Sequence, residues 1–247
     1  MSQKYFMEWG QGDKKIVFLH YFGGAADSWK YVAEKLADHF HCFALNLPGF
    51  GNTPPLEKPS VLAMAQWIQK QLVLMDIYDC SVVGHSMSAK IALQLAAQQA
   101  EIQIDRIVLV APSPPTHEPM PQEERKRMLH HPDAAEAKKT ASQASVKKLN
   151  NEVKQLAIQT QLEIDHNTWR WWLLDGMNNS IADQLNTIKQ DITLIVSEDD
   201  PVISMDTVHK EIIPLLPEAE LISTQGIGHL IPLEAPDWLA EQLRSIL

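Results

Sequence analysis

The chain has 247 residues, of which 45% are hydrophobic and 21% charged, and its formal net charge is −10. These values are typical of an ordinary globular protein that is long enough to bury a sizeable core. The negative charge disfavours nucleic acid as a partner, because domains that bind it present basic surfaces. No apolar run approaches the roughly 18 residues of a membrane span, so we expect no membrane partner either.

The chain has two cysteines, Cys42 and Cys80, and each lies near the start of an apolar run. We interpret both as small core residues and not as a disulfide, which fits a reducing compartment. The first residues lack the basic-then-apolar pattern of a secretory signal. Together these features predict a cytoplasmic protein.

Predicted strands alternate with predicted helices over most of the chain. The strands are expected near residues 5–9, 16–20, 42–46, 80–84, 106–110, 192–197 and 219–223. The helices are expected near residues 25–39, 61–75, 87–99, 205–213 and 235–247. This alternation predicts an α/β fold with a mostly parallel central sheet and helices on both of its faces. Ligands bind to such sheets beyond the carboxyl ends of the strands.

The alternation stops after the strand near 106–110. A proline-rich stretch is followed there by helical segments rich in Ala, Lys, Glu and Gln, without any strand pattern. We therefore predict a helical cap at 113–183, inserted into a core made of 1–112 and 184–247. A cap in this position shapes the substrate pocket and excludes water. Its charged run, residues 123–148, is expected to be solvated helix surface.

The strongest functional signal is the segment Ser81–Lys90. An apolar run ends in Gly84. Ser86 follows Gly84 after one intervening residue, Ser88 follows Ser86 after another, and a helical pattern begins at this point. The pattern predicts a strand, a sharp turn and a helix, with Ser86 at the apex, where the backbone needs a positive φ and small neighbours. Such a turn exposes a nucleophilic hydroxyl above the sheet. The alternative interpretation is a serine that only caps a helix.

Two later segments offer partners for this serine. The strand near 192–197 runs into acidic residues that include Asp199 and Asp200. We prefer Asp200, because Pro201 fixes the loop directly after it, and Asp199 is the alternative. The last predicted strand is followed by a glycine-containing loop that presents His229.

Serine, acid and histidine follow one another in this order along the chain, and their chemistry is complementary. His229 takes the proton of Ser86, and a carboxylate holds the imidazole in one tautomer. A glycine pair, Gly23-Gly24, follows the strand near 16–20 and can aim the amide of Phe22 at the oxygen of a tetrahedral intermediate. The amide of Met87 would be the second donor. The alternative for the glycine pair is an ordinary turn.

Five motifs carry a family resemblance: His20–Gly23, Pro48–Thr53, Gly84–Ser88, Ser197–Pro201 and Gly228–His229. In them the chain resembles the α/β-hydrolase superfamily, in particular its small esterase-like members with a helical cap. The resemblance covers nearly the whole chain. It implies that Ser86, Asp200 and His229 form a catalytic triad. It also implies that Phe22 and Met87 supply the oxyanion-hole amides.

Two positions depart from the family pattern, since Tyr21 and Ser88 stand where the family usually has glycine. We expect Tyr21 to narrow the pocket mouth and Ser88 to put more strain on the turn.

Trp169 and Trp172 share a helical face and form either an aromatic wall of the pocket or an anchor to the core. We predict no cofactor and no metal site, because the pair His130-His131 has no acidic or cysteine ligands at metal-like spacing nearby.

The sequence thus predicts a serine hydrolase that cleaves carboxylic esters with short to medium acyl chains through an acyl-serine intermediate. Relatives use the same triad for C–C bond hydrolysis, thioester hydrolysis, perhydrolysis and lyase chemistry, and the sequence does not separate these reactions. A non-catalytic ligand-binding homologue is a less favoured alternative. We expect a small-molecule ester as the partner and a monomer or homodimer as the assembly.

Overall fold

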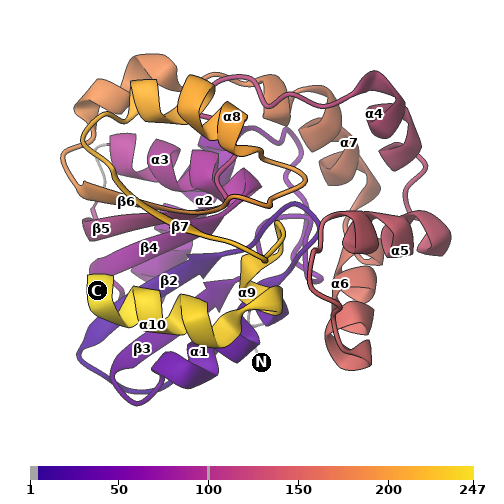
Figure 1. Cartoon of the computed structure of the whole chain (residues 1–247). Coiled ribbons are helices and arrows are strands. Elements are labelled where there is room, and N and C mark those ends of the chain that lie inside the picture. The colour runs from indigo at the N-terminus through magenta and orange to yellow at the C-terminus, as the bar shows by residue number, and fades with distance from the viewer. Residues whose placement is uncertain (1–4, 99–100) are drawn as a thin grey trace.

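A seven-stranded sheet forms the centre of the computed structural model, which describes residues 5–98 and 101–247 (Figure 1). The strands are β1 (Phe6–Trp9), β2 (Lys14–Leu19), β3 (Phe40–Leu45), β4 (Asp79–His85), β5 (Gln103–Val110), β6 (Asp191–Ser197) and β7 (Glu220–Thr224). They lie in the order β1-β3-β2-β4-β5-β6-β7, and β1 pairs antiparallel with β3 while the other pairs are parallel. The predicted mostly parallel sheet is therefore confirmed.

Alternate residues of the central strands face opposite sides of the sheet. In β2, Val17 and Leu19 belong to one buried cluster, whereas Ile16 and Phe18 belong to the other. Burial on both faces explains why this strand is a continuous apolar run and not an alternation of apolar and polar residues.

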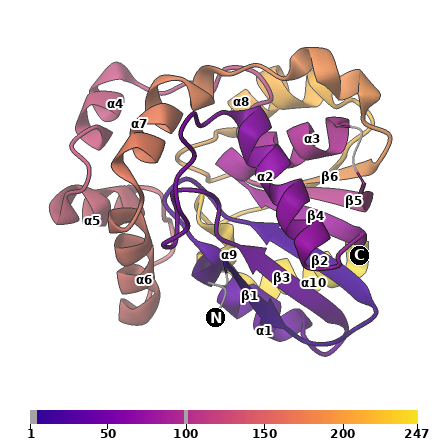
Figure 2. The same cartoon turned by 180° about the vertical axis from the view of Figure 1, so that it is seen from behind.

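Helices cover both faces of the sheet (Figures 1 and 2). The pair on one face is α1 (Lys30–Leu36) and α10 (Pro236–Ile246), and the pair on the other is α2 (Val61–Leu74) and α3 (Met87–Ala97). These four helices correspond to predicted ones. The end predicted for the third, at residue 99, lies outside the described residues.

Two predicted helices differ from the structure in detail. The one expected at 25–39 begins as a 3-10 turn, η1 (Ala26–Trp29), before α1. The one expected at 205–213 divides into α8 (Met205–Thr207), a π-helical turn η4 (Val208–Ile212) and a 3-10 turn η5 (Ile213–Leu215). Pro214 explains the end of this segment, because it has no amide hydrogen to continue an α-helix.

Four helices lie between β5 and β6: α4 (Gln122–Met128), α5 (Ala134–Gln143), α6 (Asn151–Leu162) and α7 (His166–Leu174). We call them the inserted helices. The side chains of Asp133, Asn150 and Asp165 cap three of them by accepting first-turn amides. The inserted helices stand to one side of the sheet (Figure 1), and two short turns, η2 (Gly176–Asn178) and η3 (Ala182–Thr187), lead back to β6.

The inserted helices fall within the segment predicted as a cap, 113–183, and the boundaries of that cap stay a prediction. Among residues 5–98 and 101–247, no helix has the length and apolar character needed to cross a bilayer.

Candidate active site

Ser86 occupies the sharp turn between β4 and α3. Its backbone has φ 54° and ψ −117°, which is the positive φ that the sequence predicts for the apex. A Cβ on Gly84 would lie 2.6 Å from the carbonyl oxygen of Ser88, so only glycine fits there. The amide of Ser86 donates to the carbonyl of Val110 on the neighbouring strand (2.9 Å), which fixes the turn at the carboxyl edge of the sheet.

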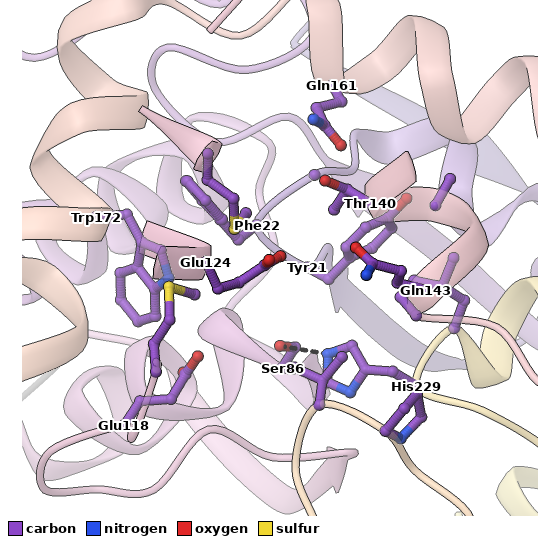
Figure 3. Close-up of a pocket in the computed structure, with 18 of the residues that line it drawn as sticks. Tyr21, Phe22, Ser86, Glu118, Glu124, Thr140, Gln143, Gln161, Trp172 and His229 are labelled. Atoms are coloured by element: carbon purple, nitrogen blue, oxygen red, sulfur yellow. Dashed lines mark hydrogen bonds between the residues drawn. The ribbon is translucent and has the colours of Figure 1, made fainter. Parts of the chain in front are cut away.

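The structure brings Ser86, His229 and Asp200 together in one hydrogen-bonded chain. His229 Nε2 lies 2.8 Å from Ser86 Oγ (Figure 3), and His229 Nδ1 lies 2.8 Å from Asp200 Oδ2. The other carboxylate oxygen, Asp200 Oδ1, accepts the amides of Val202 (2.7 Å) and Ile203 (2.9 Å). Because an ionised carboxylate only accepts, His229 carries its proton on Nδ1 and leaves Nε2 free to accept from the serine.

The alternative acid, Asp199, points elsewhere. Its side chain is exposed and accepts the amide of Gly226 at 2.6 Å. Asp200 is buried, with 6% of the residue exposed, and it is the acid that contacts His229. The preference for Asp200 over Asp199 therefore matches the geometry.

Five influences set the protonation of His229. Burial favours the neutral imidazole and lowers its pKa, but the charge of Asp200 and the hydrogen bond to it act in the opposite direction. The carboxylates of Glu118 and Glu234 also favour the imidazolium, and the net effect is a pKa of His229 above its ordinary value of 6.5. The raised pKa makes His229 a better base towards the serine proton than an ordinary imidazole.

The loop that carries His229 is held by the end of α5 and by Glu234, the last residue of α9 (Ile231–Glu234). The amide of His229 donates to the carbonyl of Ala144 (2.8 Å). Glu234 Oε2 accepts the amides of Gly228 (2.9 Å), Val146 (2.9 Å) and Lys147 (2.8 Å). The inserted helices thus contribute to the position of the histidine.

His85, inside the turn sequence, has a supporting role. It is buried, and its Nε2 donates to the carbonyl of His229 (2.9 Å). Burial lowers the pKa of His85 well below its ordinary value, and the neighbouring His229 acts in the same direction. A neutral His85 therefore holds the backbone of His229 in place.

The two predicted oxyanion amides belong to Phe22 and Met87. Met87 is the first residue of α3, where first-turn amides have no partner within the helix. Phe22 lies in the loop after β2, between Tyr21 and Gly23. In the described part of the chain neither amide donates a hydrogen bond. An amide without a protein acceptor is what an oxyanion-hole donor requires, and that role of Phe22 and Met87 stays a prediction.

A cavity of about 500 Å³ opens above Ser86 and His229. Tyr21, Trp169 and Trp172 line it, as the sequence predicts. Trp169 and Trp172 are also fully buried, and Trp169 donates through Nε1 to the carbonyl of Met128 (2.7 Å) and stacks on Phe22 with ring centroids 4.2 Å apart. The two tryptophans thus line the cavity and also pack in the buried core; their role as a wall of a substrate pocket stays a prediction.

The sequence prediction of solvated surface for residues 123–148 is wrong for part of α4. Glu124 lines the cavity, and Arg127 is largely buried and donates to the carboxylates of Glu124 and Glu136 and to Thr140 Oγ1 (3.0 Å). Figure 3 shows Glu124 and Thr140 at the cavity opposite Ser86. One face of α4 turns inward because its helix packs over the pocket, and no local pattern in a run of charged residues identifies that face.

Glu118 and Lys90 are further buried charged residues that the sequence reasoning missed. Glu118 lines the cavity, and Lys90, one turn after Ser86 in α3, is buried beneath Trp172 with its Nζ 5.5 Å from the ring centroid. Lys90 sits in the predicted helix but on its inward face, where a lysine is exceptional. Burial lowers its pKa to about 8, and the carboxylate of Glu118 partly offsets that effect.

His131, one of the paired histidines, packs inside the inserted helices. Its ring stacks on Trp169 with centroids 4.4 Å apart, and Nε2 donates to the carbonyl of Gln161 (2.8 Å). Within the described residues, no three His, Cys, Asp or Glu side chains are grouped so that they could hold a metal ion.

Comparison with known sequences places the chain in a family. A sequence model of the α/β-hydrolase fold matches residues 14–138, just over half of the chain. A pimeloyl-[acyl-carrier protein] methyl ester esterase of Aeromonas salmonicida is 34% identical over 105 residues, which is 42% of this chain and 40% of the relative. The dihydrolipoyllysine-residue acetyltransferase component of an acetoin cleaving system of Cupriavidus necator is 36% identical over 104 residues, 42% of this chain and 28% of the relative. The match thus spans less than half of the length of these curated relatives.

Solved structures share the fold over nearly the whole chain. An esterase from Exiguobacterium antarcticum superimposes with a TM-score of 0.87 at 15% identity, covering 98% of this chain and 94% of that one. A meta-cleavage product hydrolase from Pseudomonas fluorescens superimposes with a TM-score of 0.81 at 16% identity, covering 97% and 92%. With the family match over residues 14–138, these similarities show that the chain belongs to the α/β-hydrolase fold family.

Proposed function

We propose that the chain is a serine hydrolase that cleaves carboxylic esters through an acyl-serine intermediate. The observation that carries this proposal is the hydrogen-bonded chain from Ser86 through His229 to Asp200 at the floor of a cavity. The curated relatives named as methyl ester esterases support the same reaction class.

In the first half of the reaction Ser86 Oγ attacks the ester carbonyl while His229 Nε2 takes the hydroxyl proton. Asp200 stabilises the imidazolium that forms. The amides of Phe22 and Met87 donate to the developing oxyanion, and each such donor lowers the barrier by about 3–4 kcal/mol. His229 then gives its proton to the leaving alcohol, and the acyl group stays on Ser86.

In the second half a water molecule replaces the alcohol. His229 takes a proton from the water as it attacks the acyl-serine, and returns a proton to Ser86 as the acid leaves. This chemistry needs only the side chains and amides already named, so the proposal includes no cofactor.

The cavity and the inserted helices set the substrate size. A volume of about 500 Å³, walled by Trp169 and Trp172, suits an ester with a short or medium acyl chain. We propose that the inserted helices act as a cap that excludes water from the reacting carbonyl.

The test is hydrolysis of p-nitrophenyl acetate, butyrate, octanoate and palmitate by the wild type and by Ser86→Ala. We expect turnover of the shorter esters, and a loss of roughly 10⁶-fold in kcat when the nucleophile is removed. Ser86→Ala should fold normally, as circular dichroism would show. Full activity in this variant would refute the proposal, and no turnover of any ester by the folded wild type would redirect it towards C–C bond hydrolysis or ligand binding.

A further inference from the structure

Glu118 is a buried carboxylate whose hydrogen-bonding capacity is not used up. It lies in the loop between β5 and α4, and 5% of the residue is exposed. Its Oε2 atom is fully buried and has no hydrogen bond of good geometry from the described residues; the hydroxyl of Ser113, itself buried without a partner, is the donor nearby. Burial raises the pKa of Glu118, and Ser113, Lys90 and His229 act in the opposite direction, towards the ionised carboxylate. Burying a carboxylate oxygen without a donor is costly, so such a group in a folded protein requires an explanation.

The nearest buried cation does not provide that donor. Lys90 Nζ donates to the carbonyls of Thr116 (2.7 Å), Asn179 (2.9 Å) and Met177 (3.2 Å), and no ion pair joins it to Glu118 in the described structure. The amide of Glu118 itself donates to the carbonyl of Met177 (2.8 Å). The backbone around Glu118 is therefore fixed while its carboxylate oxygen stays without a partner.

The carboxylate faces the same cavity as the reacting atoms. Figure 3 shows Glu118 and Ser86 on the same side of the cavity, with Trp172 beside Glu118. Glu118 is also close enough to His229 for its charge to favour the imidazolium. A group bound to Glu118 would therefore lie in the same cavity as the ester under attack.

Among the charged residues of the described cavity lining, Glu118 is the carboxylate without an ion pair. Among the described residues the lining includes three glutamates and neither lysine nor arginine. Glu124 is paired with Arg127, and Glu123 has a side chain that is 83% exposed and pairs with Lys126. The interior next to Ser86 thus presents negative charge and an unused acceptor.

We propose that Glu118 is a specificity residue that binds a hydroxyl or ammonium group of the substrate close to the scissile ester, and that it rejects esters carrying a second carboxylate. This inference rests on the proposed ester hydrolysis and names its substrate class. A hydroxyl or ammonium group of the substrate would donate a hydrogen bond to Oε2. Hydrogen bonds to an ionised carboxylate are stronger than those between neutral groups. A carboxylate would meet a like charge where little water screens it.

Four methyl esters of similar length test the inference, with the released acid titrated at constant pH 7.5. They are methyl butyrate, methyl 3-hydroxybutyrate, methyl 3-aminobutyrate and monomethyl succinate. We expect the wild type to prefer at least one donor-bearing ester over methyl butyrate by about 10–100-fold in kcat/KM, and to reject monomethyl succinate. The better of the two donor esters identifies the donor as hydroxyl or ammonium.

Two variants separate charge from hydrogen bonding. Glu118→Gln keeps the size and an acceptor oxygen but removes the charge, so it should relax the rejection of monomethyl succinate and weaken any preference for the ammonium ester. Glu118→Met removes the acceptor and should abolish the preference for either donor. The matched control is Glu241→Gln, an exposed glutamate of α10 that does not line the cavity, for which the ratios between esters should not change.

Thermal unfolding would first establish that each variant is folded. If Glu118→Gln and Glu118→Met hydrolyse all four esters in the wild-type ratios, the inference is wrong and the proposed function stands. If the folded wild type hydrolyses neither these esters nor any p-nitrophenyl ester, the proposed function fails, and the inference fails with it.

Discussion

Replacing Asp200 with asparagine should remove almost all ester hydrolysis while leaving the fold intact. Asp200 Oδ1 accepts the amides of Val202 and Ile203, whereas Oδ2 faces His229 Nδ1 at 2.8 Å. An asparagine at this position has one oxygen, and the two amides hold that oxygen in the place of Oδ1. The side-chain NH₂ group then points at Nδ1 of the histidine.

The consequence is the wrong tautomer of His229. Nδ1 must accept from the NH₂ group, so the neutral imidazole carries its proton on Nε2, which faces Ser86 Oγ at 2.8 Å. A protonated Nε2 cannot take the serine proton. The same change in a serine protease lowers kcat by about 10⁴, which corresponds to about 5.4 kcal/mol of barrier at 1.36 kcal/mol for each factor of ten.

The assay is kcat with p-nitrophenyl butyrate, accompanied by urea unfolding. Because the two backbone hydrogen bonds persist, the free energy of unfolding should fall by less than about 3 kcal/mol. Asp199→Asn is the matched control, since Asp199 is exposed and accepts only the amide of Gly226 among the described residues; its kcat should change little. A folded Asp200→Asn variant with more than a tenth of the wild-type kcat, or an equal loss in Asp199→Asn, would refute this reasoning.

Two further predictions follow from the site. Because the pKa of His229 is raised and the base must be neutral, kcat/KM should increase with pH through an apparent pKa above 6.5, and a pH–rate profile that is flat from pH 5 to 8 would contradict this. Ser88 is buried and its hydroxyl donates to the carbonyl of His20, so Ser88→Gly should lower the free energy of unfolding by about 1–2 kcal/mol from the lost hydrogen bond and the glycine in a helix. Urea unfolding would measure that change, and an unchanged midpoint would count against it.

The parts of the site that could be predicted are those fixed by local backbone chemistry. A positive φ at Ser86 demands small residues around it, and Gly84 is the one whose Cβ would collide with the next turn. Pro201 made Asp200 the preferred acid, and the structure shows that loop turning the Asp200 carboxylate inward towards two amides and His229. These constraints act within a few residues, so they leave a visible pattern in the sequence.

The parts that could not be predicted depend on how distant segments pack. Glu124 and Arg127 look like any charged pair on a solvated helix, and only the docking of α4 over the cavity brings them inward. Glu118 lies in a proline-rich loop without periodicity, so nothing local distinguishes it from a surface glutamate. For Phe22 and Met87 the functional group is the amide, whose direction no side chain reveals.

The two departures from the family pattern act together on the oxyanion loop. The Ser88 hydroxyl holds the carbonyl of His20 on one side of the loop. On the other side, the buried ring of Tyr21 packs against His85 with centroids 5.1 Å apart, and Thr160 of α6 donates to the carbonyl of Gly23 (2.8 Å). The loop that carries the Phe22 amide is thus tied both to the helix after the nucleophile and to an inserted helix. Since stabilisation of an oxyanion depends on donors that are already in place, the side chains of Tyr21 and Ser88 contribute to anchoring the loop that carries the Phe22 amide.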